Sequence, residues 1–172
     1  MILLIGALIG FVVTLLYILK TKKNRNTIDS NILHLTRLNQ IVIIVGLYLI
    51  TIGCFLGAIW ANEAWGRYWG WDPKETWCLI SILVYTFLSH MHNMKGLNSP
   101  FAFNLGSLLS FASIIMTYFG VNYFLGGMHS YAGGGDTPAV PVGAYVAVIV
   151  VVVMMYWAYF NQQRLEKLPP AK

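Results

Sequence analysis

The sequence predicts an all-α fold, a polytopic membrane helix bundle, and three observations lead to that prediction. The 172 residues are 58% hydrophobic, and the mean hydropathy is +0.65. Only 10% are charged, whereas a soluble domain carries roughly 25%. The apolar residues form long runs, and a membrane-spanning helix needs about 20 of them. Because every backbone polar group must be satisfied inside the bilayer, these runs are expected to be helices.

About five transmembrane helices are expected, within a single membrane domain that covers residues 1–172 and has no internal repeat. The segments are 1–19, 40–60, 77–91, 101–124 and 142–160. The third is short, and residues 73–76 can supply its first turn. The first has neither a basic stretch before it nor a small-residue cleavage site after it, so it is not expected to be a secretory signal. It also begins abruptly, so the chain is expected to be the C-terminal part of a longer protein.

Basic residues are distributed unequally between the two sides of this bundle. Only Arg67 and Lys74 lie on one side. Nine lie on the other: Lys20, Lys22, Lys23, Arg25 and Arg37 in the first connection, Lys95 in the third, and Arg164, Lys167 and Lys172 in the tail. The positive-inside rule places the nine in the cytoplasm or its equivalent, and the N-terminus and the connections 61–76 and 125–141 outside. The net charge of +5 is therefore a sign of topology, and no nucleic-acid partner is expected.

The outward connection 61–76 is rich in tryptophan, with four in the thirteen residues from Trp65 to Trp77. Trp65, Tyr68 and Trp69 have the spacing i, i+3 and i+4, so a helical turn would place these rings on one face. Two interpretations are open: an aromatic belt at the membrane interface, or a platform for a flat, apolar, partly charged ligand. The crowding of the rings into one connection, interleaved with glycine, favours the platform.

The tetrapeptide Asp72-Pro73-Lys74-Glu75 is typical of a helix start. Asp at the N-cap, Pro at the first position and Glu at the third form a capping box. This signature predicts that the third membrane helix begins here. The two carboxylates can therefore set the shape of the connection, a role that is compatible with a place for Asp72 in the platform.

Two histidines are candidate functional residues, and one of them is a candidate ligand for haem iron. His129 lies in the outward connection 125–141, on the same side as the tryptophans, where an imidazole could be an axial ligand or simply a solvated side chain. His90 lies about 17 residues into the third helix, roughly 25 Å from its start. An ionisable group at such a depth suggests a function. His92 lies about 200° further round the helix and is expected to be an ordinary polar terminus, and His34 to be solvated on the inner side.

Cys54 and Cys78 are isolated from each other along the chain. Their spacing matches neither a zinc site nor a CxxC redox pair, so they are expected to be small packing residues.

The segment from Trp65 to Trp77 closely resembles the tryptophan-rich WWD signature of the haem-handling membrane proteins of cytochrome c maturation. Within that superfamily the chain resembles the CcsA (ResC) type of the system II cytochrome c synthase. The likeness extends to GAIWA at 57–61, YTFLSH at 85–90, NY at 122–123 and GGMHSY at 126–131. It therefore covers essentially the whole chain.

This resemblance implies a function in which haem b is conducted outward, presented on the WWD platform and joined through its vinyl groups to the CxxCH cysteines of apocytochrome c. The platform would comprise Trp65, Tyr68, Trp69, Trp71 and Asp72. His129 matches the second of two outward histidines that hold the iron. His90 matches a membrane histidine thought to hold haem in transit, together with one from a CcsB/ResB-like partner or a fused upstream domain. No residue matches a general base.

The chain departs from the family pattern because no histidine precedes His34, whereas the family's first outward histidine lies further upstream. The chain is therefore expected to be a component of a haem lyase and to be inactive alone. Its expected location is a bacterial plasma membrane or else a thylakoid. One alternative is a system I-like protein that delivers haem to a chaperone without thioether chemistry. Another is a haem-binding electron-transfer subunit.

Overall fold

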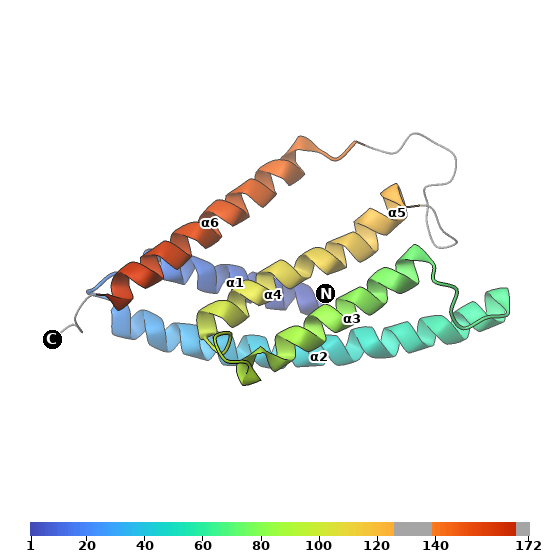
Figure 1. Cartoon of the computed structure of the whole chain (residues 1–172), viewed down its shortest axis with the longest axis horizontal. Helices are drawn as coiled ribbons and strands as arrows, with labels where there is room; N and C mark the ends of the chain where they lie inside the picture. Colours follow the sequence, from blue (N-terminus) through green and yellow to red (C-terminus); the bar gives the residue numbers. More distant parts are fainter. Residues whose placement is uncertain (126–138, 168–172) are drawn as a thin grey trace.

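The computed structural model describes residues 1–125 and 139–167, and within them every regular element is a helix (Figure 1). The elements in chain order are α1 (Ile2–Leu19), α2 (Arg25–Trp65), α3 (Pro73–His90), η1 (Met91–Asn93), α4 (Pro100–Ile115), η2 (Met116–Gly120), α5 (Val121–Phe124) and α6 (Val142–Glu166). The helix η2 is a single π-helical segment that joins α4 to α5. The all-α helix bundle predicted from the sequence is confirmed.

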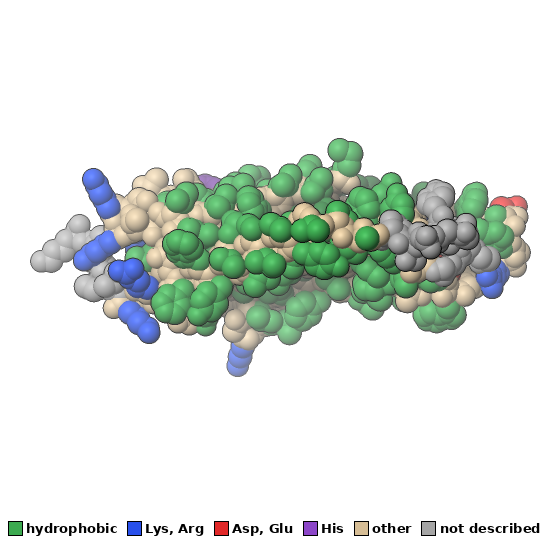
Figure 2. All heavy atoms as spheres, turned by 90° about the horizontal axis from the view of Figure 1, so that it is seen from above, with side chains coloured by type: hydrophobic (Ala, Val, Ile, Leu, Met, Phe, Trp, Pro, Cys, Tyr) green, Lys and Arg blue, Asp and Glu red, His purple; other side chains and the backbone are tan. Residues whose placement is uncertain are grey.

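Four of the described helices are long and apolar enough to cross a membrane: α1, α2, the rod Pro100–Phe124 and α6. Figure 2 shows hydrophobic side chains covering the flank of the bundle, with Lys and Arg side chains gathered mainly toward its ends. The remaining helix, α3, has Lys74 and Glu75 in its first turn and His90 at its last position. Because α3 has only 18 residues, any segment of it long enough to span a membrane includes these charged or polar groups. A membrane-spanning role for α3 stays a prediction.

The helix α2 is much longer than the expected span 40–60, since it begins at Arg25 and has 41 residues. The first connection is consequently short, and both His34 and Arg37 lie on the helix instead of in a loop. The reason is a buried stripe at helical spacing, Ile28, Ile32 and Thr36, which packs on the bundle although the opposite face is polar. At 1.5 Å per residue the helix is about 60 Å long, about twice the thickness of the hydrocarbon core of a bilayer.

The helix α1 lies at the centre of the packing and contacts α2, α4 and α6. Its approach to α4 requires a glycine, because a Cβ at Gly10 would lie 2.6 Å from the carbonyl oxygen of Asn104. Val13 and Tyr17 of α1 are buried in a cluster with Ile32 of α2 and Ala158 of α6. Close approach and apolar burial thus hold together helices that are distant in sequence.

A buried polar cluster joins three helices inside this apolar bundle. Asn104 of α4 accepts a hydrogen bond from Nδ2 of Asn39 on α2, at 2.9 Å. It also donates through its own Nδ2 to Oγ1 of Thr36, at 2.7 Å. Ser107 of α4 donates to the carbonyl oxygen of Gly6 on α1, at 3.0 Å. These side chains have few alternative partners in an apolar interior, so the cluster fixes the register of α1, α2 and α4.

We expect Asn104→Ala to lower the free energy of unfolding by about 1–3 kcal/mol. The substitution leaves the Nδ2 group of Asn39 buried without its acceptor. Asn98→Ala is the matched control, because Asn98 is exposed in the connection before α4. The measurement is unfolding of the purified protein in mixed micelles, followed by tryptophan fluorescence. Equal stability of the two variants would show that the cluster does not hold the helices in register.

Candidate functional site

The helix α2 ends at Trp65 because Gly66 adopts a left-handed conformation, with φ of 69°. Such a residue is a common helix terminator, and its N–H donates to the carbonyl oxygen of Asn62 at 2.8 Å. The expected helical turn that would align Trp65, Tyr68 and Trp69 is therefore wrong. We define residues 66–72 as the tryptophan loop. Tyr68 and Trp69 lie in this loop, whereas Trp65 is the last residue of α2.

The helix α3 begins with the capping box predicted from the sequence. Oδ2 of Asp72 accepts from the N–H of Lys74 at 3.2 Å, and the reciprocal bond runs from the N–H of Asp72 to Oε2 of Glu75, also at 3.2 Å. The same Oε2 atom accepts from the N–H of Gly70 at 2.7 Å. Glu75 thus holds the backbone on both sides of Trp71.

Trp71 is the only non-glycine residue with a positive φ in the described part of the chain, at 57°. A left-handed conformation is unfavourable for an aromatic residue. It persists here because Glu75 binds the residues on either side of it. Trp71 is 71% exposed, and its ring lies edge-on to the ring of Trp69, with centroids 5.8 Å apart.

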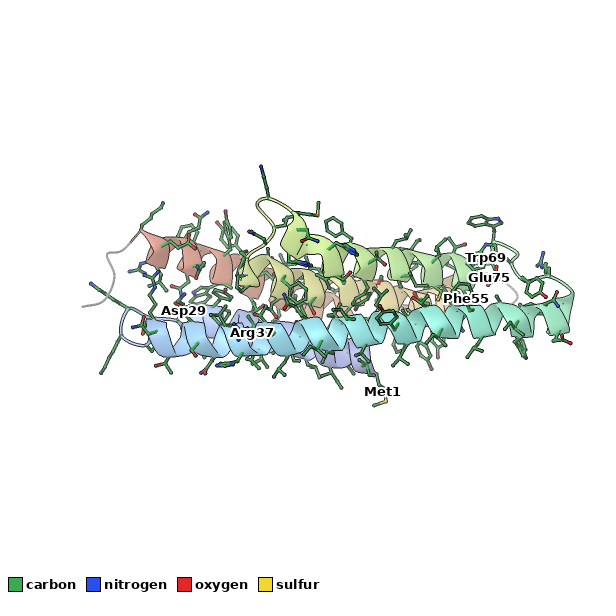
Figure 3. All side chains as sticks on the ribbon, turned by 90° about the horizontal axis from the view of Figure 1, so that it is seen from below. Met1, Asp29, Arg37, Phe55, Trp69 and Glu75 are labelled. Atoms are coloured by element: carbon green, nitrogen blue, oxygen red, sulfur yellow. The ribbon has the colours of Figure 1, made fainter. Side chains whose placement is uncertain are left out.

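A cavity of about 400 Å³ lies between the tryptophan loop and the helices α2 and α3. Its size is within the range of small-molecule pockets. Figure 3 shows Trp69 and Glu75 at one end of the bundle and Asp29 toward the other. The lining residues are Ile50, Gly53, Cys54, Gly57, Ala58 and Trp60 of α2, Tyr68 and Trp69 of the loop, and Lys74, Glu75 and Cys78 of α3.

The structure brings only part of the predicted platform to this cavity. Tyr68 and Trp69 line it, whereas Trp65, Trp71 and Asp72 do not. Trp65 instead packs edge-on against Trp60, with centroids 5.1 Å apart. Trp71 lies edge-on to Trp69, and the buried carboxylate of Asp72 caps α3. The five residues therefore divide into cavity walls and supports for those walls.

Several cavity residues were not singled out from the sequence as site residues. Cys54 and Cys78, isolated along the chain, both line the cavity from opposite helices, and both are half-buried. Trp60 adds an aromatic ring from the last turns of α2. Spacing along α2 could have indicated this wall, because Gly53, Cys54 and Gly57 occupy one helical face. A Cβ added at either glycine would have no neighbouring atom within 4 Å, so this face is open.

Lys74 connects the cavity to α5. Its Nζ donates to Oδ1 of Asn122 at 3.1 Å, and Asn122 itself is buried. Nearby, Ser81 of α3 and Thr117 of η2 share a hydrogen bond of 3.0 Å. These bonds hold the end of the rod Pro100–Phe124 beside the start of α3.

The histidines are at different places. His90 ends α3, at the opposite end from the tryptophan loop, and is exposed. Its Nδ1 lies 2.8 Å from the carbonyl oxygen of Thr86, which leaves Nε2 as the atom for a further ligand. His92 lines two smaller cavities beside α2, of about 210 and 190 Å³, and His34 is exposed on α2. His129 lies outside the described residues, as does most of the connection 125–141.

We expect Glu75→Ala to loosen the tryptophan loop, because two backbone N–H groups lose their acceptor. Glu75→Gln retains a side-chain oxygen and is the matched control. Arg67 lies in the loop and is exposed, so the measurement is the rate of tryptic cleavage after Arg67 in the purified protein. Loss of about 1–2 kcal/mol of local stability should speed cleavage several-fold in the alanine variant only. Similar rates in both variants would contradict the role assigned to Glu75.

Comparison with known proteins identifies relatives of this chain. Residues 1–129 match the family model described as cytochrome C assembly protein. The protein NrfI of Wolinella succinogenes is 48% identical over 134 residues, which are 78% of this chain and 15% of that protein. The cytochrome c biogenesis proteins CcsA of Agrostis stolonifera and Helianthus annuus are 45% and 47% identical over 100 and 93 residues. These matches cover 56% and 52% of this chain, but only 30% and 28% of the relatives. The chain therefore spans less than a third of the length of the relatives it matches.

Proposed function

Because the chain belongs to the cytochrome c assembly protein family, we propose that it is the haem-presenting part of a larger cytochrome c synthase. In this proposal residues 1–172 are the C-terminal part of a CcsA-like assembly domain. A CcsB/ResB-like partner, or an upstream domain of the same protein, completes it. The substrates are haem b and the CxxCH segment of apocytochrome c.

The observation that carries this proposal is the cavity beneath the tryptophan loop. Its walls are an open face of α2 and the rings of Trp60, Tyr68 and Trp69, and its edge carries the charged groups of Lys74 and Glu75. A flat, largely apolar macrocycle with acidic substituents is complementary to walls of this kind. Trp71, 71% exposed, would extend the aromatic surface beyond the cavity.

We assign axial coordination of the haem iron at this site to His129. His129 follows Asn122 by seven residues, and an extended chain covers about 3.3–3.6 Å per residue. The backbone therefore keeps the Cα atom of His129 within roughly 25 Å of that of Asn122, whose side chain bonds to Lys74 at the cavity edge. The second ligand would come from the part of the protein upstream of this chain.

His90 is assigned to a separate haem position, because it lies at the far end of α3. The bond between its Nδ1 and the carbonyl oxygen of Thr86 is the arrangement usual for metal-binding histidines, in which the other ring nitrogen binds the metal. The exposure of His90 on the bundle leaves room for a histidine of a partner segment. Haem would pass from this position to the tryptophan loop.

The proposed chemistry adds each cysteine thiol of the CxxCH segment across a haem vinyl group. Protein groups would contribute orientation, because holding the vinyl edge against the peptide turns a bimolecular step into a local one. The macrocycle and its iron supply the reactivity. If haem were delivered to a chaperone instead, the same cavity would bind it but no thioether would form.

Charge supports an orientation with the tryptophan loop outside a bacterial plasma membrane, or in the equivalent position of a thylakoid. The longest uncharged part of α2 runs from Leu38 to Asn62, between Arg37 and Glu63. The connection after η1, which contains Lys95, packs beside Arg37 and Gln40. The part of the bundle where Arg37 and the connection containing Lys95 lie side by side therefore suits the inner boundary of the membrane.

Filling the cavity with haem should shield its thiols. In the Cys54→Ser variant, Cys78 is the one cysteine of the chain, and excess haem is expected to slow its reaction with a maleimide at least several-fold. For the control, a cysteine introduced by Asn98→Cys in a chain lacking Cys54 and Cys78 lies away from the cavity and should react equally with and without haem. Unchanged labelling of Cys78 would exclude haem from this cavity.

The synthase function is tested with the full-length protein and its partner, expressed beside a CxxCH reporter. We expect wild type and His34→Ala to attach haem that survives denaturing electrophoresis. His129→Ala should abolish attachment and lower the haem retained on purification. Equal retention in the two histidine variants would remove the ligand role of His129. Haem bound by the wild type without any attached to the reporter would favour delivery to a chaperone.

A further inference from the structure

We propose that Lys74 binds the propionate carboxylates of haem and thereby sets which edge of the macrocycle faces the apocytochrome. This inference rests on the proposed function and deepens it, since it assigns an orientation to haem in the cavity. Lys74 is a positioning residue here and takes no part in bond formation.

The charge of Lys74 is available for an anionic ligand. Lys74 takes part in no ion pair with another of the residues 1–125 and 139–167. The partner of its ammonium is the neutral amide of Asn122, at 3.1 Å. This bond holds the side chain in place without neutralising it. A half-buried cation held in this way favours a carboxylate that can reach it.

The neighbouring carboxylate, Glu75, is already engaged by the tryptophan loop. Its Oε2 atom accepts from the N–H groups of Gly70 and Asp72. Glu75 therefore serves the protein's own backbone, whereas Lys74 is left for the ligand. Lys74 also lies in the first turn of α3, where the helix dipole adds partial positive charge that favours an anion.

The lining of the cavity combines the charged groups of Lys74 and Glu75 with a wall of small and apolar residues of α2. Cys78 lies one helical turn beyond Lys74 on α3, about 6 Å along the axis, and faces a wall that includes Gly53 and Gly57. Haem has the same asymmetry, because its propionates occupy one edge and its vinyl groups the other two pyrroles. Propionates at Lys74 fix one edge of the macrocycle at the start of α3, so the vinyl-bearing rings lie on the opposite edge.

The experiment compares two ligands in the full-length protein with its partner: iron protoporphyrin IX and its dimethyl ester, whose carboxylates are masked. We expect Lys74→Gln to weaken binding of the free acid roughly tenfold, the usual effect of losing a charged hydrogen bond. Binding of the dimethyl ester should not change. Lys74→Arg should restore binding of the free acid. Lys95→Gln, at an exposed lysine beyond η1, is the control and should alter neither.

Two outcomes would overturn this assignment alone. Free-acid affinity that is the same in wild type and Lys74→Gln would show that Lys74 does not contact the propionates. An equal loss for both ligands would show that Lys74 only supports the loop. Failure of the wild type to bind either ligand would instead overturn the proposed function, and the present inference with it.

Discussion

The carboxylate of Glu75 is the interaction on which the tryptophan end of the molecule depends. One oxygen accepts from the N–H groups of Gly70 and Asp72, so it determines both where α3 begins and how the loop returns from α2. Trp71 lies between these two groups and is held in a left-handed conformation that its side chain would otherwise disfavour. Without these two hydrogen bonds, the loop backbone would no longer hold Trp71 edge-on to Trp69. The cavity wall formed by Tyr68 and Trp69 would lose the same support.

The rest of the bundle provides a fixed frame for this loop. Asn104, Asn39 and Thr36 form hydrogen bonds inside an apolar bundle, where each bond is directional and apolar packing is not. Apolar contacts alone would allow α1, α2 and α4 to slide past one another, whereas this cluster permits one register. At the other end, Lys20 is buried and bonded to Asp29, which connects the end of α1 to the start of α2.

The aromatic residues beside the helix bundle have different structural roles. Some rings line the cavity, and others hold those rings or extend the surface. Trp60 and Trp65 pack against each other across the end of α2, so they stiffen the helix terminus next to the cavity. In the proposed function this rigidity has a purpose, because thioether formation requires the vinyl carbons to be held close to the thiols. A loose aromatic belt would offer the same apolar area without that precision.

The sequence by itself determined the features that depend on local pattern. Long apolar runs gave the helix bundle, because backbone groups in a bilayer have no alternative to helical bonding. The order Asp72-Pro73-Lys74-Glu75 gave the start of α3, because a capping box closes within four residues. The WWD segment also gave the family that the comparison with known proteins then identified.

Only the tertiary structure decided which residues meet. The helix α2 extends back to Arg25 because Ile28, Ile32 and Thr36 find partners on other helices, and the sequence does not identify those partners. Gly66 ended α2 before the expected aromatic turn could form. Cys54 and Cys78 reach one cavity, and Lys74 reaches Asn122, across separations of 24 and 48 residues in the sequence. Such contacts are set by the register and close approach of packed helices, which no local spacing encodes.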